Sequence, residues 1–189
     1  LQSPFNFQFT NSNEGFYFIS TTSTDPEWEG SGIEELYYYT LSSNSSTKVD
    51  LGWEMGIGRG YSLSNDNLVV SLANNTTRKI AYYQKSSSTG KKLPVNLETM
   101  NDHVSILDVQ KKGNKVAFTY STASNIPTNF VADISVKKGQ VSFIYQKEFA
   151  SLNANLKKKK ITKSEIMKWL GPNNDKVDGI LYYHLNYKQ

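Results

Sequence analysis

A polar turn followed by a β-favouring run occurs three times in this chain, and this repeat limits the folds that the chain can adopt. The three runs cover residues 16–20, 68–72 and 116–120, and their starts lie 52 and 48 residues apart. These spacings lie close to the upper end of the ~40–50 residues of one four-stranded blade of a β-propeller. Second β-favouring runs follow at residues 35–40, 79–84 and 129–134, and a further one at 141–145. The repeat predicts about three antiparallel four-stranded blades.

Composition agrees with an all-β chain that contains very little helix. The sequence has 12 Tyr and 9 Phe, which fit a pleated surface well, and few apolar residues recur at helical spacing. A propeller closes with roughly 4–8 blades, because closure covers the apolar faces and edges of each sheet. Three blades leave two faces uncovered. We therefore expect the chain to be part of a longer propeller, or to be completed by another unit.

Charge and cysteine content exclude several classes of function. The formal net charge of +4 is small for 189 residues, so we expect neither nucleic acid nor a membrane as a partner. There is no cysteine, which excludes disulfides, thiolate catalysis and Cys-based zinc sites. No apolar run approaches the ~18 residues of a membrane span. Either a cytoplasmic or a periplasmic or secreted location stays open.

The C-terminal stretch predicts a β-hairpin. Polar and apolar residues alternate over 163–170, and the alternation stops at Gly171-Pro172-Asn173-Asn174-Asp175. A second β-favouring run then covers residues 176–187 and includes His184. We expect two strands joined by the loop 171–175.

This stretch resembles the entry into the peptidase domain of the prolyl oligopeptidase family of serine peptidases, in its acylaminoacyl-peptidase and dipeptidyl-peptidase-like branches. The similar residues are Glu165-x-x-x-Trp169, Val177-Asp178-Gly179-Ile180-Leu181-Tyr182-Tyr183 and Leu185-Asn186-Tyr187-Lys188. Upstream, residues 121–134 and Leu152-Asn153-x-x-Leu156 resemble the last propeller blade before that entry. His184 departs from the family pattern, because many relatives have proline there.

The resemblance implies a division of the chain into three parts. Residues 1–156 form a partial β-propeller of about three blades, and 157–163, which include four consecutive lysines, form a linker. Residues 164–189 form the first strands of a truncated α/β-hydrolase domain.

The resemblance also implies a function. The chain is expected to be the non-catalytic propeller segment of a serine peptidase, which gates access to a downstream Ser-His-Asp hydrolase domain and positions peptide substrate for it. The expected partners are the peptide substrate and the downstream hydrolase domain, and no cofactor or metal is implied. One alternative is a non-catalytic propeller module that binds a protein or peptide partner. Another is a relative whose hydrolase domain has lost its serine.

Glu34 and Glu35 are the candidate substrate-binding residues, and this assignment comes from the resemblance. In dipeptidyl-peptidase relatives a pair of propeller glutamates holds the free amino terminus of the substrate, as two carboxylates can do in a shielded cavity. Residues 32–37 lack the aromatic and acidic context of that motif. The favoured interpretation is therefore a solvated strand start.

No residue of this chain is predicted to be catalytic or to bind a metal. Residues 60–64 (GYSLS) lack the second glycine of a nucleophile elbow, and no helix is expected after them. Residues 56–60 (GIGRG) are interpreted as a loop between blades, because no helix N-terminus follows to bind a phosphate. His103 is expected at a strand start and His184 in the final strand, and neither has nearby ligands for a metal.

Overall fold

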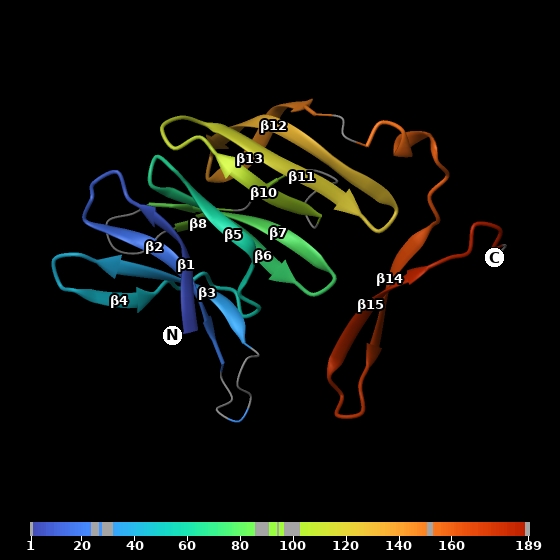
Figure 1. Ribbon diagram of the computed structural model, residues 1–189, viewed down its shortest axis with the longest axis horizontal. Coiled ribbons are helices and arrows are strands. Elements are labelled where there is room, and N and C mark those ends of the chain that lie inside the picture. Colours follow the sequence, from blue (N-terminus) through green and yellow to red (C-terminus); the bar gives the residue numbers. More distant parts are fainter. Residues whose placement is uncertain are drawn as a thin grey trace.

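The computed structural model describes residues 2–23, 27, 32–85, 91–93, 95–96, 103–150 and 153–187, and it is built from β-strands (Figure 1). The strands in the blades are β1 (Gln2–Phe9), β2 (Gly15–Thr22), β3 (Ile33–Thr40), β4 (Ser45–Lys48), β5 (Ile57–Ser64), β6 (Asn67–Asn74), β7 (Thr77–Gln84), β8 (Lys91–Leu93), β9 (Val95–Asn96), β10 (Val104–Val109), β11 (Lys115–Thr122), β12 (Asn125–Lys137) and β13 (Gln140–Glu148). A short 3-10 turn, η2 (Leu156–Lys158), precedes β14 (Ser164–Leu170) and β15 (Lys176–Tyr182).

The strands form three blade-like sheets and one separate hairpin. Sheet A has the order β1-β2-β3-β4 and sheet B the order β5-β6-β7-β8, and all neighbours in them are antiparallel. Sheet C has the order β10-β11-β12-β13, with β9 added in parallel along β13. The hairpin consists of β14 and β15. The prediction of three antiparallel four-stranded units is confirmed.

Side-chain alternation gives each blade two packing faces. On β6, Leu68, Val70 and Leu72 belong to the core shared with sheet A, whereas Val69 lies in the core shared with sheet C. Sheet B is therefore buried on both sides. This face-to-face succession of meandering sheets is that of consecutive propeller blades, and the chain is a partial β-propeller.

The innermost strands of sheets A and B are also joined by hydrogen bonds. Tyr61 on β5 donates its hydroxyl to the backbone oxygen of Asn6 on β1 at 2.7 Å, and Gln8 donates its side-chain amide to the Tyr61 carbonyl at 3.0 Å. Burial raises the pKa of Tyr61, so the phenol stays a protonated donor at neutral pH.

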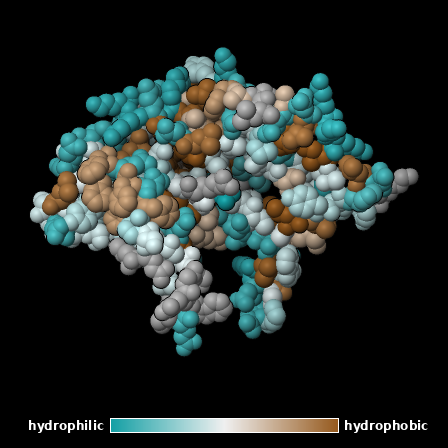
Figure 2. Space-filling model, viewed as in Figure 1, coloured by the Kyte–Doolittle hydropathy of each residue, from teal (hydrophilic) through white to brown (hydrophobic). Residues whose placement is uncertain are grey.

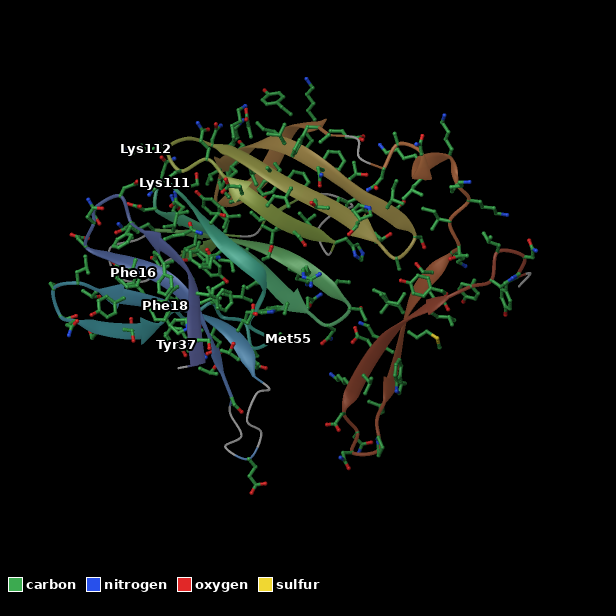
Figure 3. All side chains as sticks on the ribbon, in the orientation of Figure 1. Phe16, Phe18, Tyr37, Met55, Lys111 and Lys112 are labelled. Carbon is green, nitrogen blue, oxygen red and sulfur yellow. The ribbon has the colours of Figure 1, made fainter. Side chains whose placement is uncertain are left out.

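Turns at one end of the blades link the three sheets. The backbone amide of Asn11 donates to Asp66 Oδ1 at 2.8 Å, and this bond joins the β1–β2 turn to the β5–β6 turn. The backbone amide of Asn65 donates to the Lys111 carbonyl at 3.0 Å, and this bond joins the β5–β6 turn to the β10–β11 turn. Figure 3 shows Lys111 and Lys112 at the tip of this last turn, at the end of sheet C far from the hairpin.

The outward face of sheet A is aromatic and only partly covered. Phe7 and Phe9 are 54% and 49% exposed. The Phe7 and Phe18 rings stack at 5.9 Å, and the Phe18 and Tyr37 rings at 5.4 Å. Figure 2 shows apolar atoms gathered over β1 and β2, and Figure 3 shows Phe16 beside Phe18 and Tyr37 in the same place. The corresponding faces of sheets B and C are each covered by the preceding sheet.

The hairpin forms where it was predicted, but its second strand is shorter than expected. The Gly171 amide donates to the Asp175 carbonyl at 2.8 Å and closes the loop. The second strand ends at Tyr182, so His184 lies in the turn after it, and the prediction that it lies in the final strand is wrong.

The prediction of a loop at residues 56–60 is also wrong, because β5 already begins at Ile57.

Phe118 offers a test of the core between sheets B and C. Its side chain is fully buried and its ring lies 5.5 Å from Phe130 and 5.4 Å from Phe143. We expect Phe118→Ala to lower the free energy of unfolding by about 3–5 kcal/mol, because it removes apolar contacts and leaves a cavity. Denaturant unfolding followed by circular dichroism measures this.

Leu107→Ala in the same sheet is the control, since Leu107 is 53% exposed. The expected change there is within about 0.5 kcal/mol. Equal losses for the two variants would contradict the assigned core.

Candidate binding cleft between the blades and the hairpin

A cleft of about 460 Å³ lies where the hairpin meets the blade ends. One wall is built from the start of β7, His103 before β10, and the β11–β12 turn. The other wall comes from Ser164, Glu165 and Tyr182 of the hairpin. Most of the lining side chains carry a hydroxyl group; these are Thr76, Thr77, Ser105, Ser121, Thr122, Ser124, Ser164 and Tyr182. Such a surface can both donate and accept hydrogen bonds.

A second cleft, of about 540 Å³, lies between sheets A and B and shares Thr76, Thr77 and Arg78 with the first. Its lining on the side of sheet A includes Glu34, together with Met55 from the segment before β5. Figure 3 labels Met55. Gly56 keeps this side closely packed. Its φ is +72°, and a Cβ there would lie 2.2 Å from Ile33 Cγ2 and 2.4 Å from the Glu34 carbonyl. Only glycine allows this approach of β5 to β3.

Two contacts hold the hairpin against the blades. The Thr76 hydroxyl donates to Asp178 Oδ2 at 3.1 Å, and the Thr76 amide lies 3.5 Å from the same oxygen. The hydroxyls of Ser124 and Ser164 lie 2.5 Å apart. The β6–β7 and β11–β12 turns therefore each have one hydrogen-bonded attachment to the hairpin.

Arg78 and His103 bring two basic side chains together from different blades. Their backbones form an isolated parallel bridge, so the two side chains leave the strands on the same side. Arg78 Nε donates to the Gly58 carbonyl at 3.4 Å, and the His103 ring meets Tyr120 edge-on at 6.3 Å. This wall of the cleft is basic.

Two carboxylates of the hairpin lie near the cleft and both accept hydrogen bonds. Glu165 Oε1 accepts a hydrogen bond from the Tyr183 hydroxyl at 2.5 Å, and this bond is the main cause that raises the pKa of Tyr183 to about 12. Asp178 faces Thr76 from the neighbouring strand. Of these two residues, Glu165 is in the lining of the cleft and Asp178 is not.

The structure does not bring Glu34 and Glu35 together. They are consecutive residues on β3, and consecutive side chains of a strand point to opposite faces. Glu35 Oε1 pairs with Lys48 Nζ at 2.6 Å, and the Thr22 hydroxyl lies 3.3 Å from Glu35 Oε2. Glu34 instead lines the second cleft. Glu35 is therefore bound within sheet A, and only Glu34 faces a cleft.

The serine motif at residues 60–64 lies wholly inside β5. Ser62 is buried in mid-strand, and the Ser64 hydroxyl donates to the Gly113 carbonyl at 2.8 Å. An elbow needs a strand that turns into a helix, and β5 instead turns into β6.

Within the part of the chain that the structure describes, no three His, Cys, Asp or Glu side chains gather as metal ligands. In the same part, no helix has the length and apolarity needed to cross a membrane.

The fold and cleft define a partial β-propeller with a hairpin fastened to one end. No family model matches the chain, and no curated protein matches it. Among solved structures, TolB from Acinetobacter baumannii aligns with a TM-score of 0.47 and 13% identity. The alignment covers 75% of this chain and 32% of that one, so the chain spans about a third of the TolB structure. These comparisons give no support to the peptidase resemblance.

Removing the Asp178 carboxylate should loosen the hairpin. We expect Asp178→Ala to speed backbone hydrogen exchange in residues 164–182, because the Thr76 hydroxyl and amide lose their acceptor. Exchange measured by mass spectrometry reports this, and sheets A and B should keep their protection. Asp175→Ala in the exposed loop is the matched control. Unchanged exchange in both variants would show that the contact does not hold the hairpin.

Titration of Tyr183 tests its hydrogen bond to Glu165. The bond to Glu165 favours the protonated phenol, so the pKa rises from the ordinary value of about 10 to about 12. The stabilisation is present below pH ~10 and is lost as the pH rises through the folded pKa. Glu165→Gln should return the pKa toward 10, as measured by NMR of the tyrosine ring carbons. Glu148→Gln should leave it unchanged, and a Tyr183 pKa of 10 in the unmodified protein would refute the bond.

Proposed function

We propose that this chain is a non-catalytic propeller segment that binds peptide in the cleft between its blades and the hairpin. The observation that carries the proposal is the attachment of β14–β15 over a hydroxyl-rich cleft. Extended peptides present backbone donors and acceptors along their length, and the hydroxyl side chains from both walls match them. A volume of about 460 Å³ is within the usual range for small-ligand sites.

In its finer form, the proposal places the chain in a serine peptidase similar to the prolyl oligopeptidase family. The residues from Glu165 to Trp169 and from Val177 to Tyr182, which carry most of this resemblance, lie in the strand pair, and an isolated pair is marginally stable without further strands. Its apolar side chains are exposed on both faces, with Trp169 at 50%. In this form of the proposal, a hydrolase sheet continues from the hairpin, covers these side chains and closes the open side of the cleft.

In such an enzyme, catalysis and peptide binding belong to different domains. A downstream domain supplies the serine, the histidine, the aspartate and the oxyanion donors. The blades admit extended peptides, exclude folded proteins and position the bound chain. The cleft residues described above therefore act on binding and orientation.

A second candidate function rests on the aromatic face of sheet A. The exposed rings of Phe7 and Phe9 lie over a stacked aromatic layer, and aromatic groups are frequent in protein interfaces. This face favours a propeller module that binds a protein partner and takes no part in peptide hydrolysis.

Two experiments test the proposal. The polypeptide encoded by the complete reading frame should react with a fluorophosphonate and hydrolyse short peptides, whereas residues 1–189 alone should do neither. A complete product without fluorophosphonate reactivity would contradict the peptidase form.

Peptide binding by residues 1–189 is tested separately, by NMR titration with unstructured tetrapeptides. Ala123→Trp should abolish binding, because Ala123 lines the cleft and indole fills it. Ser46→Trp, on the exposed edge strand β4, should leave binding unchanged. Binding that survives Ala123→Trp would exclude the cleft as the site.

A further inference from the structure

A pocket of about 280 Å³ lies at the root of the hairpin and shares no lining residue with the peptide cleft. One side is the segment 160–163, which leads into β14, and the other is the turn after β15, at residues 183–187. Figure 1 shows this turn beside the segment that enters β14. The Tyr183 backbone amide donates to the Lys163 carbonyl at 3.0 Å, and the Tyr187 backbone amide to the His184 carbonyl at 2.9 Å. Main-chain hydrogen bonds therefore hold the pocket together.

The pocket is basic. Lys160, Lys163 and His184 line it, and of the residues that the structure describes none with a carboxylate does so. Neither lysine has an ion-pair partner in the described part of the chain, whereas Lys157 of the same lysine run pairs with Glu148 at 2.5 Å. An anion in the pocket therefore meets two ammonium groups that no carboxylate neutralises.

Hydrogen bonds around the pocket leave its donors available. The Asn186 backbone amide donates to His184 Nδ1 at 3.3 Å, so the neutral ring carries its proton on Nε2, and Nε2 is the nitrogen that can donate to a ligand. Lys163 Nζ lies 5.4 Å from the centre of the Tyr183 ring, a contact that occupies no hydrogen-bond acceptor. The Glu165 carboxylate accepts from the Tyr183 hydroxyl, and Glu165 does not line the pocket.

The rest of the lining is largely apolar and aromatic. It includes Ile161, Leu185 and Tyr187. The rings of Tyr183 and Tyr187 lie 5.1 Å apart, and Tyr187 is 59% exposed, so a planar group can pack on the exposed ring. The volume suits a ligand that is small compared with a drug-sized molecule.

We propose that this pocket binds a small aromatic phosphate monoester, with its phosphate on Lys160, Lys163 and His184 and its aromatic group on Tyr187. A phosphate monoester carries nearly two negative charges and three acceptor oxygens, and so it matches three donors better than a carboxylate does. The aromatic group can belong to a nucleotide or to an aryl phosphate such as phosphotyrosine. Because its lining is separate from the peptide cleft, the site stands independently of the proposed function.

NMR titration of the 189-residue chain tests the site with phenyl phosphate, methyl phosphate, phenol and adenosine monophosphate. Salt at about 0.15 M screens long-range attraction. Phenyl phosphate should bind at least about tenfold more tightly than phenol, because phenol lacks the charge, and about threefold more tightly than methyl phosphate, which lacks the ring. Adenosine monophosphate distinguishes the sources: tighter binding than phenyl phosphate indicates a nucleotide, and weaker binding indicates an aryl phosphate.

Variants assign the binding to the pocket. Lys160→Gln and Lys163→Gln together should weaken phenyl phosphate about tenfold. Lys158→Gln and Lys159→Gln together are the matched control: they remove two charges from the same lysine run, but neither residue lines the pocket, and binding should stay within about twofold. Tyr187→Leu should remove the preference for phenyl phosphate over methyl phosphate. NMR spectra of each variant check that the fold is retained.

The outcomes separate this site from a diffuse attraction to the lysine run. Equal losses in the two double variants would overturn the proposal, and so would phenol or methyl phosphate that binds as tightly as phenyl phosphate. If none of the probes binds, the phosphate site is rejected and the peptide-binding cleft is unaffected. Ala123→Trp, which fills the peptide cleft, should leave phenyl phosphate binding unchanged.

Discussion

Sheet B, the middle blade of this molecule, must bury both of its faces, and the packing of the other two blades depends on that constraint. Strands β5, β6 and β7 of sheet B are each 8 residues long, and the alternation of their side chains places apolar residues on both sides of the sheet. Sheet B meets the requirement completely, because Val70 packs toward sheet A and Val69 toward sheet C, and neither is exposed. Sheet A meets it on one side only. Its other face keeps Phe7 and Phe9 in contact with solvent.

Local sequence patterns predicted the strands well, because most strands here are β-favouring runs bounded by polar turns. They failed at β5, whose glycines resemble a loop. The reason is tertiary: a Cβ on Gly58 would lie 3.0 Å from the Ala73 amide and 3.1 Å from the Leu72 carbonyl. The glycines of this strand therefore reflect close packing against β6 as well as turn formation.

The candidate cleft could not be found in the sequence in the same way. Arg78 and His103 are distant in the chain and meet only because sheets B and C pack against each other. Thr76 gave no functional signal, although its partner Asp178 lay in the stretch that carries the family resemblance. Glu34 and Glu35 show the opposite case: adjacency in sequence suggested a pair, and strand geometry separated them. Only the hairpin side of the cleft was foreseeable.

The short strand β9 has a consequence for how sheet C forms. It pairs Val95 with Val141 and Asn96 with Ser142, which are far apart in the sequence, and it covers the outer edge of β13. Closing so long a loop is entropically costly, so this pairing belongs late in folding, after the local meander β10–β13 has formed. Until then β13 has an unpaired edge that can recruit strands from other molecules. In the folded protein, the backbone of β9 occupies the edge of β13 at Val141 and Ser142, and this part of the edge is closed to strands of other molecules.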